Sequence, residues 1–434
     1  MDLKNIAIKA KNASLVMSSL STKIKNDALA AVASAIEDNK KLILEENKKD
    51  LDIAQKLVDE YKLTKAMYSR LELTDYKIRD MVQGIKDIIK LDDPINKVLW
   101  GIELDNNLEL YRISSPIGVI GVIFESRPDV VAQIASLAIK SSNAIILKGG
   151  SEASFSNKIL VQIINTALST VKEFPENAIS MIQTREDVNK MLEMDEYIDL
   201  IIPRGGNSLV KFIQSNTKIP VLGHADGICH VYADENADFE KAIKICIDSK
   251  TQYPSACNAV ETILVNKKIA NEFLPVLISA LKEADVLVKG DEMTCFIVPG
   301  IEKTTEDDWS TEYGDKIVSI KVVNDLSEAI NHINTYGSGH TDCIVTENKE
   351  HAEIFMNMVD SAGVYLNAST RFADGFRYGL GAEVGISTNK THARGPVGLE
   401  GLVIYKYKLY GNGQVVAEYS GENAKNFTHK TINN

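Results

Sequence analysis

The sequence has no long hydrophobic segment. Its densest apolar run, residues 117–124, is only eight residues long and includes two glycines. A helix that crosses a bilayer needs about 20 apolar residues, so the sequence excludes such a helix. The N-terminal residues pass directly into a helical pattern, without the hydrophobic region or cleavage pattern of a signal peptide. No secretory leader is therefore expected.

Cysteine is scarce and is not spaced for cross-links or metal. The five cysteines are scattered and odd in number: Cys229, Cys246, Cys257, Cys295 and Cys343. No pair has C-x-x-C spacing, and His224 and His230, six positions apart, match no zinc motif. The sequence therefore predicts no disulfide framework, no metal site and a reduced, cytoplasmic location.

Net positive charge is also missing. The 434-residue chain carries a net charge of −12, which disfavours a general role in binding nucleic acid or anionic membranes, because either would need a basic face. An anionic small substrate held by a few local cations is still allowed. With 44% hydrophobic and 25% charged residues, the composition is that of a globular protein, and the length allows two or three domains.

The first half of the chain predicts helices followed by a parallel sheet. Residues 1 to about 90 read as helices, with Leu29, Val32, Ala33 and Ile36 forming one apolar stripe. Strands then alternate with helices at short spacing, which indicates parallel strands with crossover helices in a doubly wound domain. The predicted strands are 119–124, 144–147, 199–202 and 220–222. One predicted helix begins at 126–129, and two more span 154–171 and 208–214.

A second α/β set is predicted between residues 229 and 365. Its strands are 261–265, 317–323, 343–346 and 364–367, and its helices are 270–284, 327–336 and 351–359. The stretch 371–401 is rich in glycine and polar residues, which is typical of functional loops or of disorder. Gly411-Asn412-Gly413, after the aromatic and basic residues 405–410, predicts a hairpin turn.

Cys257 lies in the string T-Q-Y-P-S-A-C-N-A-V-E, residues 251–261. Small neighbours leave room for a substrate to reach the sulfur, and a thiolate is a strong nucleophile, so covalent catalysis is one interpretation. A free cysteine is also often a small buried hydrophobic residue. The spacing alone leaves both interpretations open.

Two glycine-containing junctions are candidate phosphate sites. Lys148-Gly149-Gly150-Ser151 and Gly205-Gly206 each follow a predicted strand and precede a predicted helix, where free N–H groups favour an anion. A G-x-G-x-x-G fingerprint is missing, and a glycine pair at such a junction, taken alone, is more often a simple turn.

Loop arginines and one loop histidine are candidates for an anion or polar site. Arginine suits bidentate capture of carboxylate or phosphate, although each residue is also compatible with a solvated surface. The arginines are Arg127, Arg204, Arg371, Arg377 and Arg394. His224, in G-H-A-D-G, is compatible with a site role or with a hydrogen-bonded loop.

Six strings occur in order along nearly the whole chain: S-P-I-G-V-I-G-V-I-F-E-S-R-P-D-V (115–130), L-K-G-G-S-E-A (147–153), I-P-R-G-G (202–206), Q-Y-P-S-A-C-N-A (252–259), V-Y-L-N-A-S-T-R-F-A-D-G (364–375) and H-A-R-G-P-V-G-L-E (392–400). Together they resemble the aldehyde dehydrogenase superfamily and, more closely, its branch of reductases that act on glutamyl phosphate. The resemblance implies an α/β fold with two doubly wound α/β domains, one for the cofactor and one catalytic, and a small oligomerisation hairpin.

The resemblance also implies domain boundaries. Residues 1–228 would form the NADP-binding domain, with a return segment at about 366–400. Residues 229–365 would form the catalytic domain that carries Cys257, and about 96–112 and 402–420 the oligomerisation element.

The activity implied by the resemblance is NADPH-dependent reduction of L-glutamyl 5-phosphate to L-glutamate 5-semialdehyde with release of phosphate, the second step of proline biosynthesis from glutamate. Cys257 would hold the glutamyl group as a thioester. The Cys257 N–H is expected to stabilise the oxyanion, with Ser126 at the position of the superfamily's second donor. Asn258 is a further catalytic candidate.

The cofactor and substrate residues follow from the same resemblance. Ser151 stands where NAD-preferring relatives often have an acidic residue, so NADPH is expected, with Glu312 at the nicotinamide ribose. The other expected cofactor residues are Lys148, Gly149, Gly150, Gly205 and Gly206. His224 stands where hydrolysing relatives carry a water-activating Glu, which fits phosphate exchange. Arg127, Asn367, Arg371, Arg394 and His224 are the expected substrate residues.

Partners and alternative functions complete the expectations. A homodimer or higher homo-oligomer and a transient contact with glutamate 5-kinase are expected, without nucleic acid or membrane. The alternatives are a coenzyme A-acylating aldehyde dehydrogenase, a cofactor-independent thiol acyltransferase or hydrolase, and a catalytically silent scaffold. The intact Cys257 argues against the scaffold. No histidine or glutamate base is adjacent to it in sequence, which argues against the acyltransferase.

Overall fold

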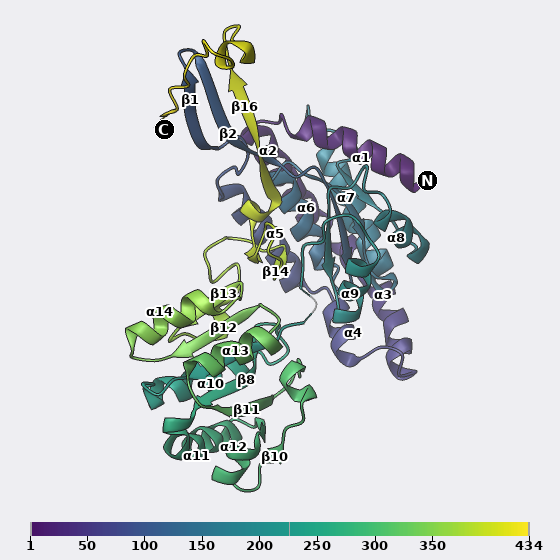
Figure 1. Ribbon diagram of the computed structural model, residues 1–434. Helices are drawn as coiled ribbons and strands as arrows, with labels where there is room; N and C mark the ends of the chain where they lie inside the picture. The colour runs from purple at the N-terminus through teal and green to yellow at the C-terminus, as the bar shows by residue number, and fades with distance from the viewer. Residues whose placement is uncertain (1, 225, 433–434) are drawn as a thin grey trace. The chain divides into compact units, whose positions relative to one another are not determined.

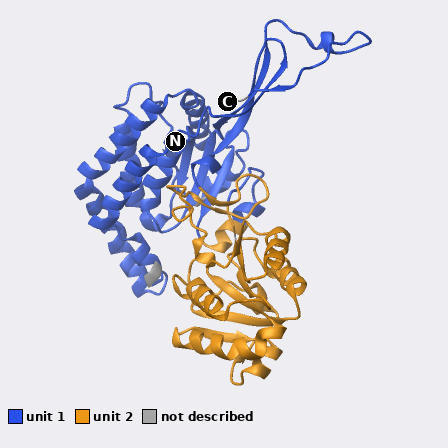
Figure 2. Ribbon diagram, turned by 90° about the vertical axis from the view of Figure 1, so that its left-hand side faces the viewer, with its two compact units in different colours: residues 1–205, 212–222, 398–434 blue, residues 206–211, 223–397 orange. Residues whose placement is uncertain are grey.

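The computed structural model describes residues 2–224 and 226–432. Two compact units divide the chain (Figure 2): unit 1 comprises Met1–Gly205, Phe212–Leu222 and Gly398–Asn434, and unit 2 comprises Gly206–Lys211 and Gly223–Val397. None of the helices in the described part of the chain is both long enough and apolar enough to cross a bilayer.

Unit 1 begins with the predicted helices. They are α1 (Leu3–Met17), α2 (Thr22–Asp38), α3 (Lys40–Asp59), α4 (Lys65–Leu71) and α5 (Asp75–Lys90). Side chains of Asp2, Ser21, Thr64 and Thr74 cap four of these helices at their N-termini. The four residues of the predicted apolar stripe on α2 are all buried, which confirms that this face of the helix packs inward.

The parallel sheet of unit 1 has the strand order β5-β4-β3-β6. The segments are β3 (Val119–Phe124), α6 (Asp129–Lys140), β4 (Ala144–Lys148), η1 (Ser151–Ala153), α7 (Ser154–Leu168), β5 (Ile179–Met181), α8 (Arg185–Leu192), β6 (Leu200–Arg204) and α9 (Asn207–Ser215). The order reverses between β3 and β6, so the loops that follow these two strands flank the switch point of the sheet. Pairing along β3 and β4 is parallel throughout, as predicted.

Two details of this sheet differ from the sequence prediction. The short β5 and α8 were not predicted. The predicted strand 220–222 is only an isolated bridge between Ile201 and Val221, because Pro220 has no N–H with which to extend a ladder.

An antiparallel sheet completes unit 1, in the order β16-β2-β1-β17. It consists of β1 (Val98–Asp105), β2 (Leu108–Pro116), β16 (Val403–Tyr410) and β17 (Lys430–Thr431). The predicted hairpin at Gly411-Asn412-Gly413 is wrong. β16 pairs instead with β2, some 290 residues earlier in the chain, and the glycines lead into η5 (Val416–Tyr419).

Unit 2 is built on one parallel sheet in the order β10-β9-β11-β8-β7-β12-β13 (Figure 1). Its segments are β7 (Cys229–Ala233), α10 (Phe239–Thr251), β8 (Val260–Asn266), α11 (Lys267–Glu283), β9 (Leu287–Gly290), α12 (Glu292–Ile297), β10 (Glu302–Lys303), β11 (Ile317–Val323), α13 (Leu326–Tyr336), β12 (Thr341–Val345), α14 (Lys349–Met358) and β13 (Gly363–Leu366). The sequence prediction missed β7, α10, β9, α12 and β10.

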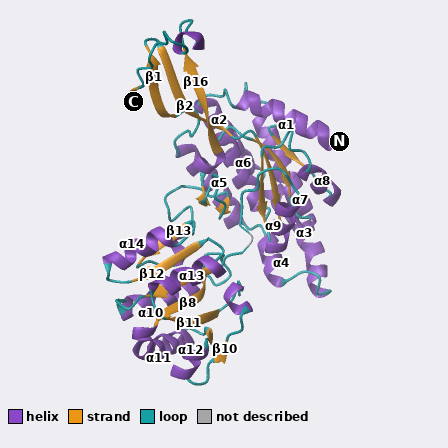
Figure 3. Cartoon of the chain, viewed as in Figure 1, coloured by secondary structure: helices purple, strands orange, loops and turns teal. Residues whose placement is uncertain are grey.

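Helices cover both faces of this sheet (Figure 3). On one face, Val231 and Ile263 belong to a core that includes Phe273 and Leu277 of α11. On the other face, Tyr232 and neighbouring strand residues pack with Ile330 of α13 and with α14. Both faces are therefore buried, as expected for a doubly wound sheet.

The segment after β13 belongs to unit 2. Residues 366–397, which contain η3 (Thr370–Phe372), β14 (Gly385–Ser387) and β15 (Gly395–Val397), cluster with unit 2, and only residues from Gly398 onward belong to unit 1. The physical reason is a set of hydrogen bonds to unit 2, including Asn258 to the Ala373 carbonyl and Arg371 to Gln252.

Candidate active site

Cys257 lies on the loop between α10 and β8, at the amino end of β8. The loops that enter the neighbouring strands β7 and β12 carry Gly227 and His340. Because parallel strands start at one edge of a sheet, these three loops meet there. The nucleophile candidate is therefore held at the amino edge of the unit 2 sheet.

His340 is the closest titratable partner of the cysteine. Its Nε2 lies 3.2 Å from the Cys257 Sγ, and its Nδ1 lies 2.9 Å from the Thr341 Oγ1. Burial, aided by His224, lowers the pKa of His340 well below its usual range, so the imidazole is neutral near pH 7. A neutral Nε2 at this distance can accept the thiol proton while Nδ1–H donates to Thr341.

Sequence reasoning missed His340. It lies in G-S-G-H-T, 83 residues after the cysteine, and no local spacing links the two. The only available signal was its place directly before a strand that enters the same sheet edge. In the folded chain Cys257 therefore has a histidine base beside it, although none is adjacent in sequence.

Gly227 lies directly against the main chain of Cys257. A Cβ added at Gly227 would stand 2.2 Å from the Cys257 carbonyl oxygen and 2.5 Å from its Cα. The Gly227 N–H donates to Glu312 Oε2 at 3.0 Å, and the Asn207 side chain donates to the same oxygen at 3.1 Å. Glu312, expected at the cofactor ribose, thus anchors the loop that covers the cysteine.

Three further predicted residues lie around the cysteine in unit 2. The Asn258 side chain donates to the Ala373 carbonyl at 2.8 Å. The Arg371 Nε donates to Gln252 Oε1 at 2.9 Å, and its guanidinium lies 5.8 Å from the centroid of the Tyr253 ring. Arg371 interacts electrostatically with Cys257, and a nearby cation favours a thiolate.

His224 packs edge-on against His340, with ring centroids 5.0 Å apart and an interplanar angle of 82°. Its Nδ1 lies 3.0 Å from the Ile386 carbonyl oxygen, which can only accept, so Nδ1 carries the hydrogen. Ligand atoms of His224, Cys257 and His340 all lie within 4.8 Å of one another. Their spacing in the sequence matches no metal motif because these three residues come from separate loops.

Two predicted substrate residues have other partners. Asn367 follows β13, at the opposite edge of the sheet from Cys257, and its amide exchanges hydrogen bonds with both backbone groups of Thr346. Its positive φ of 53° fits a turn role for asparagine. Arg394 is paired with Asp360 through its Nη2 at 3.0 Å. The structure does not bring Asn367 to the cysteine.

In unit 1, Ser126 and Arg127 follow β3 at the switch point. The Ser126 N–H and hydroxyl both donate to Glu152 Oε1 at 2.8 Å, and Ser126 has a positive φ of 48°. A hydroxyl that donates its one proton to a carboxylate cannot donate it to an oxyanion as well. Arg127 pairs with Asp129 at 3.0 Å.

The glycines after β4 pack closely against neighbouring side chains. A Cβ at Gly149 would stand 2.1 Å from the Asn157 amide nitrogen, and one at Gly150 would stand 2.0 Å from Glu152 Oε1. Both amide atoms of the buried Asn157 are without a hydrogen-bond partner. Lys148 and the exposed Ser151 flank this turn, which leads through η1 into α7. A cationic side chain, a hydroxyl and a tight turn at the carboxyl edge fit a phosphate-containing dinucleotide.

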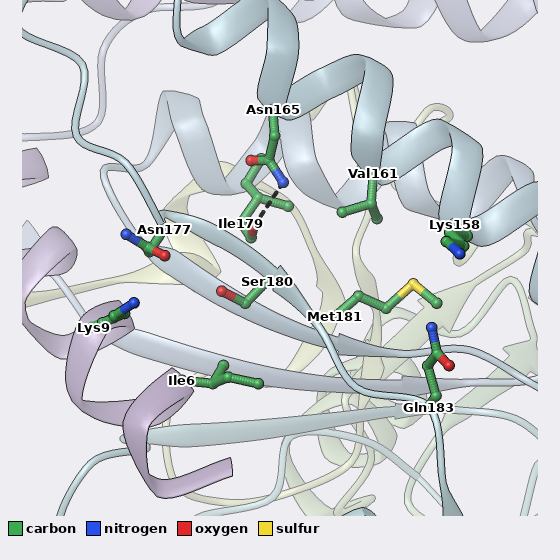
Figure 4. Close-up of a pocket in the computed structure, with 10 residues that line it drawn as sticks. All are labelled: Ile6, Lys9, Lys158, Val161, Asn165, Asn177, Ile179, Ser180, Met181 and Gln183. Atoms are coloured by element: carbon green, nitrogen blue, oxygen red, sulfur yellow. Dashed lines mark hydrogen bonds between the residues drawn. The ribbon is translucent and has the colours of Figure 1, made fainter. Parts of the chain in front are cut away.

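A separate cavity of about 310 Å³ lies in unit 1 between α1, α7 and β5 (Figure 4). Lys9 and Lys158 line it, and Asn165 on its wall donates to the Ile179 carbonyl at 3.0 Å. It contains none of the predicted catalytic, cofactor or substrate residues. The cavity is therefore distinct from the Gly149 turn.

Comparisons with known proteins agree with this architecture. Residues 1–310 match the aldehyde dehydrogenase family. A gamma-glutamyl phosphate reductase of Brachyspira hyodysenteriae is 60% identical and covers 100% of both chains, and one of Methanococcoides burtonii is 56% identical, covering 99% of this chain and 97% of its own.

Solved structures agree as well. The crystal structure of gamma-glutamyl phosphate reductase from Thermotoga maritima matches with a TM-score of 0.93 at 43% identity, over 96% of this chain and 100% of its own. An acetylating aldehyde dehydrogenase from Geobacillus thermoglucosidasius shares the fold with a TM-score of 0.64 at 19% identity, over 95% of this chain and 97% of its own. The predicted aldehyde-dehydrogenase-like α/β fold is thus confirmed. The chain belongs to the aldehyde dehydrogenase family and, within it, to the gamma-glutamyl phosphate reductases.

Proposed function

We propose that the chain catalyses the NADPH-dependent reduction of L-glutamyl 5-phosphate to L-glutamate 5-semialdehyde with release of phosphate, the second step of proline biosynthesis from glutamate. The names of its full-length relatives support the substrate. The observation that carries the chemistry is the 3.2 Å separation between the Cys257 Sγ and the neutral His340 Nε2.

The first half-reaction uses Cys257 and His340. His340 Nε2 takes the proton from the thiol, and the thiolate attacks the acyl carbonyl of the substrate. The carbon–oxygen bond to phosphate then breaks, phosphate leaves with the electron pair and takes the proton from His340, and a thioester remains on Cys257. Arg371 stabilises the thiolate, and the Cys257 N–H stabilises the oxyanion.

In the second half-reaction a nicotinamide cofactor, when bound, would supply the hydride that reduces the thioester carbonyl carbon. The resulting oxyanion on the thiohemiacetal re-forms a carbonyl, the carbon–sulfur bond breaks, and the semialdehyde is released. The sulfur departs as a thiolate, and a proton from solvent, passed through His340 Nε2, restores the thiol. His340 is therefore a proton relay in both halves of the reaction and returns to its neutral form after each.

His224 supports phosphate exchange over hydrolysis. Its imidazole is oriented by the Ile386 carbonyl and stands where hydrolysing relatives carry a carboxylate base. Because an imidazole replaces the base that activates water, the thioester remains available for reduction or for attack by phosphate. Asn258 anchors the neighbouring Ala373 and fixes the cysteine loop.

For the cofactor, Lys148, Gly149, Gly150 and Ser151 would hold the adenosine ribose and its 2′-phosphate, and Gly205 and Gly206 would lie against the pyrophosphate. The exposed, neutral Ser151 beside Lys148 supports NADPH over NADH. The Glu312 carboxylate accepts hydrogen bonds from Gly227 and Asn207, so its first role would be to anchor the Gly227 loop.

For the substrate, Arg371 is the leading candidate to bind its carboxylate or phosphate. Arg127 and Arg394 each have an aspartate partner that a substrate anion would have to displace. Asn367 is the weakest of the predicted substrate residues, because its amide already holds Thr346.

We further propose a homodimer formed through β16, a cytoplasmic location and a transient contact with glutamate 5-kinase. β16 pairs only with β2 in the sheet, and Ile404, Tyr407 and Leu409 on it are each more than half exposed. An open strand edge with apolar side chains favours pairing with a second chain. All five cysteines are free, which suits a reducing compartment.

The proposed function is tested in the reverse direction. The full chain is mixed with glutamate 5-semialdehyde and NADP, and reduction of NADP is followed with and without phosphate. Wild type is expected to require phosphate, Cys257→Ser to be inactive, and Cys295→Ser to be unaffected. Reduction that needs coenzyme A in place of phosphate, or activity retained in Cys257→Ser, would contradict the proposal.

A further inference from the structure

The Cys257 thiol and two neighbouring imidazoles form a set of ligands suited to a soft or borderline metal ion. One thiol and two imidazoles from three separate loops place their ligand atoms within 4.8 Å of one another. Cys257 and His224 are partly exposed and His340 is buried, so the group is open on one side and walled on the other. We propose that His224, Cys257 and His340 bind a single zinc ion and that this ion blocks the cysteine.

The donor chemistry favours zinc. A thiolate with imidazole nitrogens is a preferred ligand set for zinc, and three protein ligands leave a fourth position for water. Oxygen-seeking ions such as magnesium and calcium would find no carboxylate in this set.

The orientation of both histidines suits coordination. A metal-binding histidine usually donates its other ring N–H to a carbonyl or hydroxyl group, which fixes the ring and raises the basicity of the ligating nitrogen. His224 Nδ1 contacts the Ile386 carbonyl, and His340 Nδ1 contacts the Thr341 hydroxyl. In His340 it is Nε2 that points at the sulfur, 3.2 Å away.

The distances require only a small closure. Around a tetrahedral zinc ion, with bonds of about 2.0–2.1 Å to nitrogen and about 2.3 Å to sulfur, ligand atoms stand about 3.3–3.6 Å apart. The His340–Cys257 separation of 3.2 Å already matches this range within a few tenths of an ångström. The remaining pairs need to move by roughly 1 Å, which side-chain rotation can supply.

Binding converts the thiol to a metal thiolate and releases one proton to solvent. The sulfur lone pair that would attack an acyl carbonyl is then held by the ion, so metalation and acylation of Cys257 exclude each other. The site adds a reversible, metal-dependent inhibition to the proposed activity.

The test uses the full chain, first stripped of metal with a chelator. Zinc is titrated in competition with a chromophoric chelator, and cobalt(II) is used as a spectroscopic probe. Wild type is expected to bind one ion per chain, and the cobalt form to show a near-ultraviolet sulfur-to-metal band. Cys257→Ser is expected to lose that band, and His224→Asn and His340→Asn to weaken binding by roughly tenfold or more.

Matched controls are Cys295→Ser, a partly exposed cysteine on α12, and His429→Asn, an exposed histidine in unit 1. Both are expected to bind zinc like wild type. Failure of the wild type to bind one equivalent would overturn the proposal, as would a cobalt spectrum without the sulfur band or equal losses in the controls. These experiments measure zinc binding without turnover. The zinc proposal can therefore fail while the reductase activity is confirmed, and the reductase activity can fail while zinc binding is confirmed.

Discussion

The Cα of Gly227 lies against the main chain of Cys257, so closely that a methyl group there would stand 2.2 Å from the Cys257 carbonyl oxygen. The clash is with backbone, which cannot rotate away as a flexible side chain could. The loop that enters β7 therefore forms the wall against which the cysteine loop rests.

Gly227→Ala is expected to displace the cysteine and lower kcat by at least about tenfold, because a shift of about 1 Å in a reacting group is costly. Overpacking should also destabilise the fold by about 1–3 kcal/mol. Steady-state kinetics and urea unfolding measure the two effects. Gly84→Ala on α5, with nothing within 4 Å of the added Cβ, is the control and should retain full activity. Equal activity in the two variants would contradict the packing argument.

A buried ion pair closes the two ends of the cysteine loop. Lys250 Nζ, at the end of α10, lies 2.7 Å from Glu261 Oε2 near the start of β8, and both side chains are almost completely buried. Lys250→Met leaves a buried carboxylate without its cation, so we expect unfolding to become easier by about 3–5 kcal/mol. Urea denaturation measures the change.

The control for this pair is Lys241 and Glu347, whose charged atoms are 2.8 Å apart but whose side chains are half exposed. Lys241→Met should cost less than about 1 kcal/mol, because solvent screens the lost attraction. The double variant Lys250→Met with Glu261→Leu should recover much of the stability. A single Lys250→Met variant as stable as wild type would refute the role of the pair.

Cofactor preference is expected to depend on Ser151. Ser151→Glu places a negative charge where the 2′-phosphate of NADPH would lie, so kcat/KM with NADPH should fall by roughly tenfold relative to NADH. Ser154→Glu, at the first residue of α7, adds the same charge and serves as the control. An unchanged preference in Ser151→Glu would show that this residue does not determine the choice of cofactor.

Stability should fall as the pH drops below about 6.5, in part because of His332. This residue packs among the rings of Trp309, His230 and Tyr336, and burial lowers its pKa to about 2. In the unfolded chain its pKa is about 6.5, so below that value the unfolded state takes up a proton that the folded state does not. The contribution is present above pH 6.5 and is lost as the pH falls toward 2.

His332→Leu removes this titration. Between pH 7.5 and 5.5, wild type should lose about 1.4 kcal/mol more stability than the variant, as the linkage relation predicts. Urea unfolding at the two pH values measures the difference. Identical pH dependence in both proteins would contradict the buried, neutral state of His332.

The sequence predicted the elements with strong local signals. The β-branched segments β3, β8 and β11 and the amphipathic α2 follow from periodicity alone. β7 was missed because Cys229 and His230 weaken its apolar pattern. The buried His230 is stabilised by a hydrogen bond with Asp342, which comes from β12. Such pairing depends on tertiary structure that no local window contains.

The residues of the candidate site also divide into those that the sequence predicted and those that only the folded structure brings together. Cys257 and Arg371 were recognised because the strings around them resemble a known family. His340 and Gly227 were not, because their importance lies in contacts with Cys257 across the amino edge of the sheet. Ser126 and Asn367 were predicted from position in the chain, yet their polar groups are bound by Glu152 and Thr346.

The proton-acceptor role of His340 gives the last prediction. His340→Asn removes the neutral Nε2 beside the sulfur, so kcat is expected to fall by about 10²–10⁴-fold. Alkylation of Cys257 by iodoacetamide should slow as well, and the pH at which the thiol becomes reactive should rise, because the thiolate loses the group that accepts its proton. Rates of inactivation across pH measure this directly, without substrate.

His351→Asn is the control, since His351 is paired with Asp234 at the other edge of the sheet and should leave both rates unchanged. A merely structural role for His340 would lower activity without moving the pH dependence of alkylation. If His340→Asn alkylates with the wild-type pH profile, then His340 does not take the thiol proton, and Arg371 would have to sustain the thiolate by charge alone. The double variant with Arg371→Gln then distinguishes the two, because it would shift the profile only if the guanidinium is the stabilising group.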